Sequence, residues 1–190
     1  PRVLAPSLVM LFTAFSFGTV LTIIPDFSAH LGIQNKGLFF ASFTLSSLAI
    51  RFLAGRASDK YGRVMVLKVS TAVLSLAMVL IGMASSATEL LLSGILFGIA
   101  TGMNSPTIFA WTIDLSLDAN RGRAMATMYI ALEAGIGLGA LCSGWLYSNT
   151  PANFTLVFWT AGACSVVAFL YLLLKPKLAN KLAFEAAEEQ

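Results

Sequence analysis

Long apolar stretches alternate with short polar clusters along the chain, and this pattern predicts its secondary structure. Each apolar stretch is close to the roughly 20 residues that a helix needs to cross a bilayer. Continuous apolar runs favour helices over the alternating strands of a membrane barrel. We therefore expect an all-α membrane protein with six transmembrane helices and a polar cytoplasmic tail. The expected helices span residues 3–24 (closed by Pro25-Asp26), 37–53, 64–83, 90–113, 124–146 and 154–174, and the tail spans 175–190.

The composition supports the same class of protein. Of the 190 residues, 57% are hydrophobic and 11% are charged, and the mean hydropathy is +0.82. A soluble domain carries about 25% charged residues, so this composition argues strongly against a water-soluble globule. Two Cys and one His argue against a disulfide scaffold and a zinc site. No metal and no cofactor is expected.

The basic residues are divided unequally between the two sides of the expected membrane. With six spans, both termini and the connections after the second and fourth spans share one side, which holds eleven of the twelve bases, whereas Lys36 lies on the other side. By the positive-inside rule, the side with eleven bases is cytoplasmic. We expect an integral membrane protein of the bacterial inner membrane, in contact with lipid. The net charge of +3 then reflects topology rather than a nucleic-acid partner.

The connection between the second and third spans carries a motif at residues 55–63. It reads Gly55-Arg56-Ala57-Ser58-Asp59-Lys60-Tyr61-Gly62-Arg63. This segment resembles the signature G-x-x-x-D-[RK]-x-G-[RK]-[RK] of the major facilitator superfamily, which lies at the same place, between a second and a third helix. Val64 stands where the family usually has a base. A second segment, with Pro106, Ala110 and Asp114 followed by residues 120–124, resembles the family's link between the fourth and fifth helices of a half.

The resemblance implies a fold and a gate. The chain would be one six-helix half, a 3+3 inverted repeat, of a twelve-helix carrier. In the superfamily the motif's Asp docks against a helix start of the opposite half, and basic residues connect it into a network that holds the cytoplasmic side closed. The alternative is a solvated basic loop that only fixes topology. The gating residues that the resemblance implies are Gly55, Arg56, Asp59, Lys60, Gly62, Arg63 and Arg121.

The missing partner follows from the same resemblance. The segment entering the second span, residues 37–41, and the polar tail favour the carboxyl-terminal half, and Pro1 is not an initiator Met. The complementary six-helix half would come from the same polypeptide, a separate chain or a second copy. The expected function is secondary active transport of a small organic solute or drug by alternating access, and the protein is not expected to be an enzyme. A channel or a non-transporting membrane scaffold is the alternative.

Glu133 is the acid that lies deepest in the expected membrane, about 14 Å of helix rise from the start of the fifth span. It points nearly opposite Gly135, and an ionised carboxylate facing lipid is costly. We therefore expect it to face an aqueous cavity or a polar partner, with Tyr129 one turn earlier placed to hydrogen-bond it. The hypothesis is that Glu133 exchanges a proton or binds a cationic substrate during transport. The alternative is a permanently protonated acid with a structural role.

Small and polar residues recur at helical spacing in three spans. Glycines every four residues, Gly94, Gly98 and Gly102 in the fourth span and Gly135 and Gly139 in the fifth, predict faces where helices pack closely. Two other stripes are candidates for the wall of a transport cavity, although packing is the alternative for each. These candidates are Asn104, Thr107 and Trp111 in the fourth span, and Phe12, Phe15 and Thr19 in the first.

Overall fold

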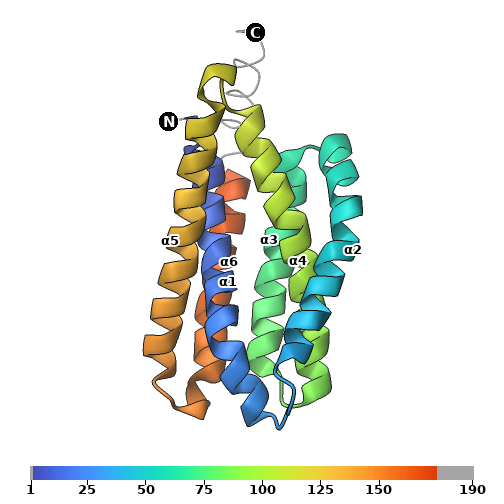
Figure 1. The fold of residues 1–190 in the computed structure, drawn as a ribbon, viewed down its shortest axis with the longest axis vertical. Coiled ribbons are helices and arrows are strands. Elements are labelled where there is room, and N and C mark those ends of the chain that lie inside the picture. The colour runs from blue at the N-terminus through green and yellow to red at the C-terminus, as the bar shows by residue number, and fades with distance from the viewer. Residues whose placement is uncertain (1, 175–190) are drawn as a thin grey trace.

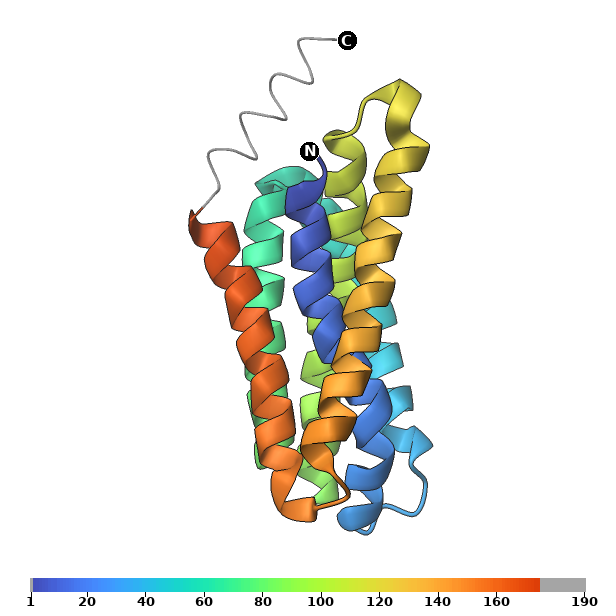
Figure 2. The ribbon, with the colours of Figure 1, turned by 90° about the vertical axis from the view of Figure 1, so that its left-hand side faces the viewer.

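Six long helices run alternately in opposite directions in a computed structural model that describes residues 2–174 (Figure 1, Figure 2). All six are long and apolar enough to cross a membrane, which confirms the predicted all-α class and makes the chain an integral membrane protein. The expected tail at 175–190 lies outside the described residues. The helices are α1 (Leu4–His30), α2 (Gly37–Tyr61), α3 (Arg63–Met83), α4 (Ala87–Asp114), α5 (Arg121–Tyr147) and α6 (Phe154–Leu174), with 3₁₀ turns η1 (Asp118–Asn120) and η2 (Pro151–Asn153) before α5 and α6.

Two helices continue past the ends that the sequence suggested. Pro25-Asp26 does not close the first helix, since α1 continues to His30. A proline removes one backbone donor, and helices in membranes tolerate this loss when neighbouring segments pack around it. Here Phe27, beyond the proline, is buried against Phe154 and Phe158 of α6. Likewise α2 does not end near residue 53 but extends to Tyr61, so most of the motif is helical.

The helices pack in pairs that relate the first three to the last three. The main contacts are α1 with α5, α2 with α4, and α3 with both α4 and α6. If α1, α2 and α3 are replaced by α4, α5 and α6 in that order, and the reverse, the α1–α5 pair becomes the α4–α2 pair and the α3–α6 pair stays the same. This pairing is the pattern expected of a 3+3 inverted repeat.

Glycine lets the backbones touch in the α1–α5 and α2–α4 pairs. A Cβ at Gly98 would overlap the carbonyl oxygen of Phe43 in α2, and a Cβ at Gly139 would overlap that of Phe15 in α1. Such close approach supplies van der Waals contact where the surrounding lipid provides no hydrophobic driving force. The predicted glycine faces of α4 and α5 are therefore confirmed as packing surfaces.

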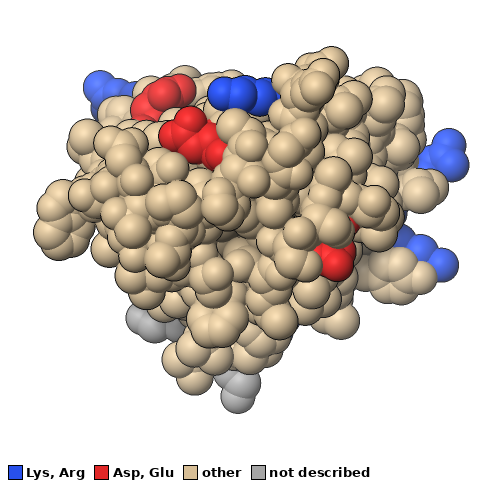
Figure 3. Space-filling model, turned by 90° about the horizontal axis from the view of Figure 1, so that it is seen from below, with Lys and Arg blue, Asp and Glu red and all other residues tan. Residues whose placement is uncertain are grey.

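Alternation of the helices puts the start of α1, the α2–α3 and α4–α5 links and the end of α6 at one end of the bundle, called the termini end here (Figure 2). An apolar core cluster that includes Leu67, Ile108 and Trp111 lies toward this end. A larger cluster that includes Phe27, Phe97 and Phe158 lies toward the opposite end. Seen from that opposite end, most of the surface is uncharged, with a few scattered charged side chains (Figure 3).

Candidate functional site

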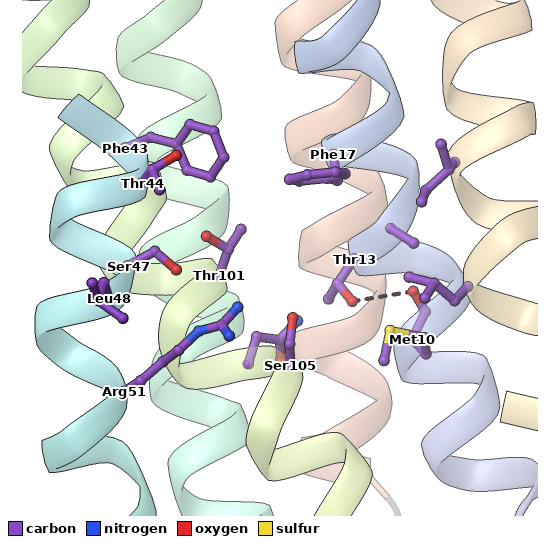
Figure 4. Close-up of a pocket in the computed structure, with 14 residues that line it drawn as sticks. Met10, Thr13, Phe17, Phe43, Thr44, Ser47, Leu48, Arg51, Thr101 and Ser105 are labelled. Atoms are coloured by element: carbon purple, nitrogen blue, oxygen red, sulfur yellow. Dashed lines mark hydrogen bonds between the residues drawn. The ribbon is translucent and has the colours of Figure 1, made fainter. Parts of the chain in front are cut away.

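A cavity of about 410 Å³ lies between the α1–α5 pair and the α2–α4 pair (Figure 4). Its volume is within the range of about 300–1,000 Å³ typical of small-molecule sites. The lining is mostly apolar, with several hydroxyl groups, one amide and one guanidinium. The wall consists of Met10, Thr13, Ala14 and Phe17 of α1, Phe43, Thr44, Ser47, Leu48 and Arg51 of α2, Thr101, Asn104 and Ser105 of α4, and Leu132 and Ile136 of α5.

Two phenylalanines form an aromatic part of this wall. Phe17 and Phe43 face each other across α1 and α2, with ring centroids 6.1 Å apart in an edge-to-face arrangement. Hydroxyl groups lie beside them, and Thr13 and Thr101 donate to carbonyl oxygens of their own helices. Both hydroxyl oxygens can still accept a hydrogen bond, and the rest of the wall is apolar. The cavity therefore suits a ligand that is partly aromatic and partly polar.

Arg51 is a cavity residue that the sequence reasoning missed. Its side chain extends from α2 toward Thr101 and Ser105 of α4 (Figure 4). Within residues 2–174 it makes no ion pair and no hydrogen bond. With the second span expected to end at residue 53, Arg51 was expected among the cytoplasmic cations. The signal was present, since Thr44, Ser47, Leu48 and Arg51 follow the i, i+3, i+4, i+7 spacing of one helix face.

The three candidates from α4 differ in where they lie. Asn104 is on the cavity wall but 4% exposed, and its side-chain oxygen accepts a hydrogen bond from Ser70 of α3. Thr107 is buried outside this wall and donates to the carbonyl of Met103. Trp111 is buried in the apolar cluster toward the termini end. The expected stripe therefore brings one polar side chain to the cavity and places two in the packed bundle.

The three candidates from α1 lie in packed positions. Phe12 and Phe15 pack against the two core clusters, toward the termini end and the opposite end respectively. Thr19 is fully buried and donates to the carbonyl oxygen of Phe15. The α1 face on the cavity consists instead of Met10, Thr13, Ala14 and Phe17, so the stripe expected from the sequence is rotated away from it.

Glu133 is exposed on the outer side of α5 rather than on the cavity wall. Leu132 and Ile136 occupy the wall, and one residue of a helix corresponds to a rotation of about 100°. The ring of Tyr129 packs on Phe109 of α4 at 5.6 Å, and Glu133 has no hydrogen bond in the part of the chain that the structure describes. The expected Tyr129–Glu133 hydrogen bond is therefore not formed within the described residues, and the Glu133 side chain is exposed on the surface of this half.

At the termini end, Arg63 joins three helices through two carboxylates. Its Nε donates to Asp114 Oδ2 at the end of α4 over 2.9 Å, and its Nη1 donates to Asp59 Oδ1 in α2 over 2.5 Å. Nη1 also donates to the hydroxyl of Ser58, 2.9 Å away. We call Asp59, Arg63 and Asp114 the Arg63 clasp. The resemblance implied Asp59 and Arg63 for this network and placed Asp114 in the family-like link after the fourth span, but it did not predict that Asp114 pairs with Arg63.

The other gating candidates lie near the clasp without joining it. Arg121 pairs with Asp118 of η1 over 2.7 Å, so it is not part of the Asp59 network. Arg56 is exposed, and the Lys60 ammonium lies 5.2 Å from the centre of the Tyr61 ring. Gly55 is inside α2 with open space beside it, whereas Gly62 has φ +86° and ends the helix. Of the two glycines among the gating candidates, Gly62 is therefore the one whose backbone conformation requires glycine.

The fold and this cavity define the chain as a six-helix membrane bundle of the transporter type. It belongs to the Major Facilitator Superfamily, whose family model matches residues 7–189. It is 30% identical over 176 residues to a triacylglyceride transporter of Mycolicibacterium smegmatis, covering 88% of this chain and 31% of that protein. It is 24% identical over 178 residues to the quinolone resistance protein NorA of Staphylococcus aureus, covering 91% of this chain and 45% of NorA.

A solved structure shows the same fold. The chain superposes on the peptide-family transporter PepTSo with a TM-score of 0.79 at 15% identity, covering 93% of this chain and 37% of that one. The chain thus spans less than half the length of these relatives.

Among residues 2–174, no three His, Cys, Asp or Glu side chains are grouped to hold a metal ion.

Proposed function

We propose that this chain forms one half of a secondary active transporter that moves a small organic solute or drug by alternating access. The observation that carries the proposal is the central cavity, which lies between two tightly packed helix pairs and is bordered by the least covered helices. In the apolar windows of α2 and α5, 17% of residues are buried, against 39–61% in the other four helices. Exposed faces beside a cavity are what a second bundle would cover.

The partner is the complementary six-helix half, supplied by the same polypeptide, a separate chain or a second copy. The span entry at residues 37–41 favours this chain as the carboxyl-terminal half. The cavity would then close against the partner's helices and hold substrate between the halves. The gathering of bases at the termini end supports a cytoplasmic position for that end in a bacterial inner membrane.

The names of the relatives support an amphipathic substrate. NorA is named for quinolone resistance and the mycobacterial relative is named a triacylglyceride transporter, so both names refer to compounds with a large apolar part. The wall around Phe17 and Phe43 fits such compounds because aromatic rings offer large apolar surface. Binding and transport, rather than catalysis, are what these residues support.

The Arg63 clasp is the proposed gate of this half. It ties the ends of α2 and α4 to the start of α3, and its partly exposed side chains can exchange their ion pairs for water. Ion pairs of this kind contribute about 0–1 kcal/mol, so a conformational change can break them at low cost. Asp59, 69% exposed at its side chain, retains an edge that faces away from Arg63 and is available to the opposite half.

The test is saturable counterflow in proteoliposomes that contain the complete carrier. A panel of labelled peptides, sugars and amphipathic drugs identifies an exchanged solute. We expect saturable exchange that falls severalfold in Arg63→Ala and stays near normal in Lys60→Ala, because Lys60 lies three residues away and has no carboxylate partner in the described chain. Flux that rises linearly with concentration would indicate a channel, and no flux for any solute would indicate a scaffold.

Glu133 is proposed as the proton-coupling residue at the interface with the partner half. Its exposed position in the middle of α5 puts a carboxylate on a face that lipid would not tolerate in ionised form. We expect Glu133→Gln to abolish the pH dependence of exchange while leaving binding intact. Unchanged uptake with unchanged pH dependence would remove this role and leave a structural acid.

A further inference from the structure

Arg51 makes no ion pair with residues 2–174, and the other residues on the cavity wall are neutral. Eight residues separate it from Asp59 along α2, about 12 Å of helix rise. It is therefore near the middle of α2 rather than at the membrane surface, and it is exposed in this half. A cation at such depth faces a water-filled cavity or a partner, because lipid does not solvate it. The side chain points into the cavity beside Thr101 and Ser105 (Figure 4).

The acids of the described chain leave Arg51 without a partner. Asp59 and Asp114 are held by Arg63, and Asp118 is held by Arg121. The remaining acids are at the opposite end, with Asp26 late in α1 and Glu89 bound to Ser85 at the start of α4, or on the outer side of α5, as Glu133 is. The cavity in this half consequently has a positive charge with no internal compensation.

Resting on the transport function proposed above, we propose that the substrate is an amphipathic organic anion whose carboxylate binds Arg51. The planar guanidinium donates two parallel hydrogen bonds to a carboxylate, which makes this pair both strong and directional. The hydroxyl group of Ser105 lies next to this position and offers a further donor, whereas the Thr101 hydroxyl already donates to the carbonyl oxygen of Phe97. The apolar body of the substrate packs against the Phe17–Phe43 pair on the cavity wall.

The position of the aromatic residues relative to Arg51 sets the shape of this substrate. Phe43 precedes Arg51 by eight residues on α2, which separates their Cα atoms by about 12 Å along the helix. The long Arg51 side chain extends into the cavity and shortens the gap (Figure 4). A molecule with an aromatic group at one end and a carboxylate at the other fits this separation, whereas a compact inorganic anion leaves the aromatic part empty.

The experiment compares two probes that share one fluorophore. Dansylglycine is an aromatic carboxylate, and dansylcadaverine has the same dansyl group with a cationic amine. Binding of each is measured by fluorescence to the purified complete carrier in lipid nanodiscs. We expect the carrier to prefer dansylglycine and Arg51→Gln to weaken its binding about 10- to 100-fold, the size expected for losing hydrogen bonds to a charged group. Dansylcadaverine binding should stay the same or rise.

Two further variants separate charge from folding. Arg51→Lys keeps the charge but not the paired donors, so it should recover part of the affinity for dansylglycine. Arg123→Gln removes an exposed arginine at the start of α5, outside this cavity wall, and should change neither probe. Equal weakening of both probes by Arg51→Gln, or no preference for the anion in the unmodified carrier, would overturn the proposal and point to an acid of the partner half as the counter-ion of Arg51.

The binding assay also separates this inference from the transport function itself. Saturable exchange of other solutes, together with dansylglycine binding that Arg51→Gln does not alter, would refute the anion site and leave the carrier function standing. Arg51-dependent binding of dansylglycine without exchange of any solute would support the anion site and refute transport.

Discussion

The two ends of the bundle are held together by different chemistry. At the termini end, Arg63 bridges Asp59 and Asp114 with side chains that are 25%, 69% and 44% exposed. At the opposite end, the Phe27 ring lies 4.6 Å from that of Phe154, which in turn stacks on Tyr147 at 4.7 Å. Water can replace the partners of an exposed ion pair, but it cannot replace aromatic contacts at comparable free energy.

The contrast indicates which end of this half is built to rearrange. Releasing the ends of α2 and α4 from the start of α3 requires breaking the ion pairs of the Arg63 clasp, which lies beyond the apolar cluster of Leu67, Ile108 and Trp111. Opening the opposite end would expose the rings that join α1, α5 and α6. We therefore expect the aromatic end to move as a rigid unit and the Arg63 clasp to be the adjustable one. Three experiments test this difference, in order of decreasing expected effect on stability.

Phe158→Ala should be the most destabilising of the three. Phe158 is 0% exposed and packs against Phe27 with ring centroids 5.6 Å apart. Truncating a fully buried Phe typically costs about 3–5 kcal/mol, because the cavity that it leaves refills only in part. Thermal unfolding of the purified protein in detergent, followed by circular dichroism, measures the loss. The matched control is Phe52→Ala, since Phe52 on α2 is 76% exposed and should cost much less.

A small loss for Phe158→Ala, no larger than that of the Phe52 control, would contradict the assignment of the opposite end as the rigid part. It would mean that the rings there are in contact without being close-packed. In that case neither end would act as a fixed support for the other.

The Arg63–Asp114 pair should contribute less, and a double-mutant cycle isolates its share. The single variants Arg63→Gln and Asp114→Asn and their combination should give a coupling free energy of about 0.5–1 kcal/mol. The coupling should shrink as salt rises, because exposed charges are screened within about 8–10 Å at physiological ionic strength. Unfolding midpoints at low and high salt provide the measurement. A coupling of zero at low salt would show that the clasp contributes nothing to closing this end.

The sequence predicted the class and the framework of the fold because the bilayer constrains both strongly. Backbone groups in hydrocarbon must bond within their own helix, so apolar length alone located six helices. The four-residue spacing of Gly94, Gly98 and Gly102 also located a packing face, since only small residues let backbones touch. Both features depend on residues that are close together in the chain, so they can be recognised from the sequence alone.

The sequence could not fix how each helix is rotated about its axis. Rotation depends on the neighbours against which a helix packs, and a difference of one position decides whether Glu133 or Leu132 faces the cavity. For the same reason the partner of Arg63 stayed hidden, because Asp114 is 51 positions away along the chain. The cavity position of Arg51 was not predicted because the second span was expected to end at residue 53, whereas α2 continues eight residues further, to Tyr61.

Arg121→Gln should be the least disruptive change, and it tests how far the charged network of the termini end extends. Arg121 pairs with Asp118 over 2.7 Å, but both side chains are more than half exposed, at 56% and 69%, and they are three residues apart on adjoining turns. Exposed pairs at this spacing contribute about 0.3–0.5 kcal/mol. We expect an unfolding midpoint close to that of the unmodified protein, and additivity with Arg63→Gln, because the two arginines bind different carboxylates. Strong non-additivity in the combined variant would show that Arg121 acts with the Arg63 clasp, and the adjustable region would then extend across the α4–α5 link.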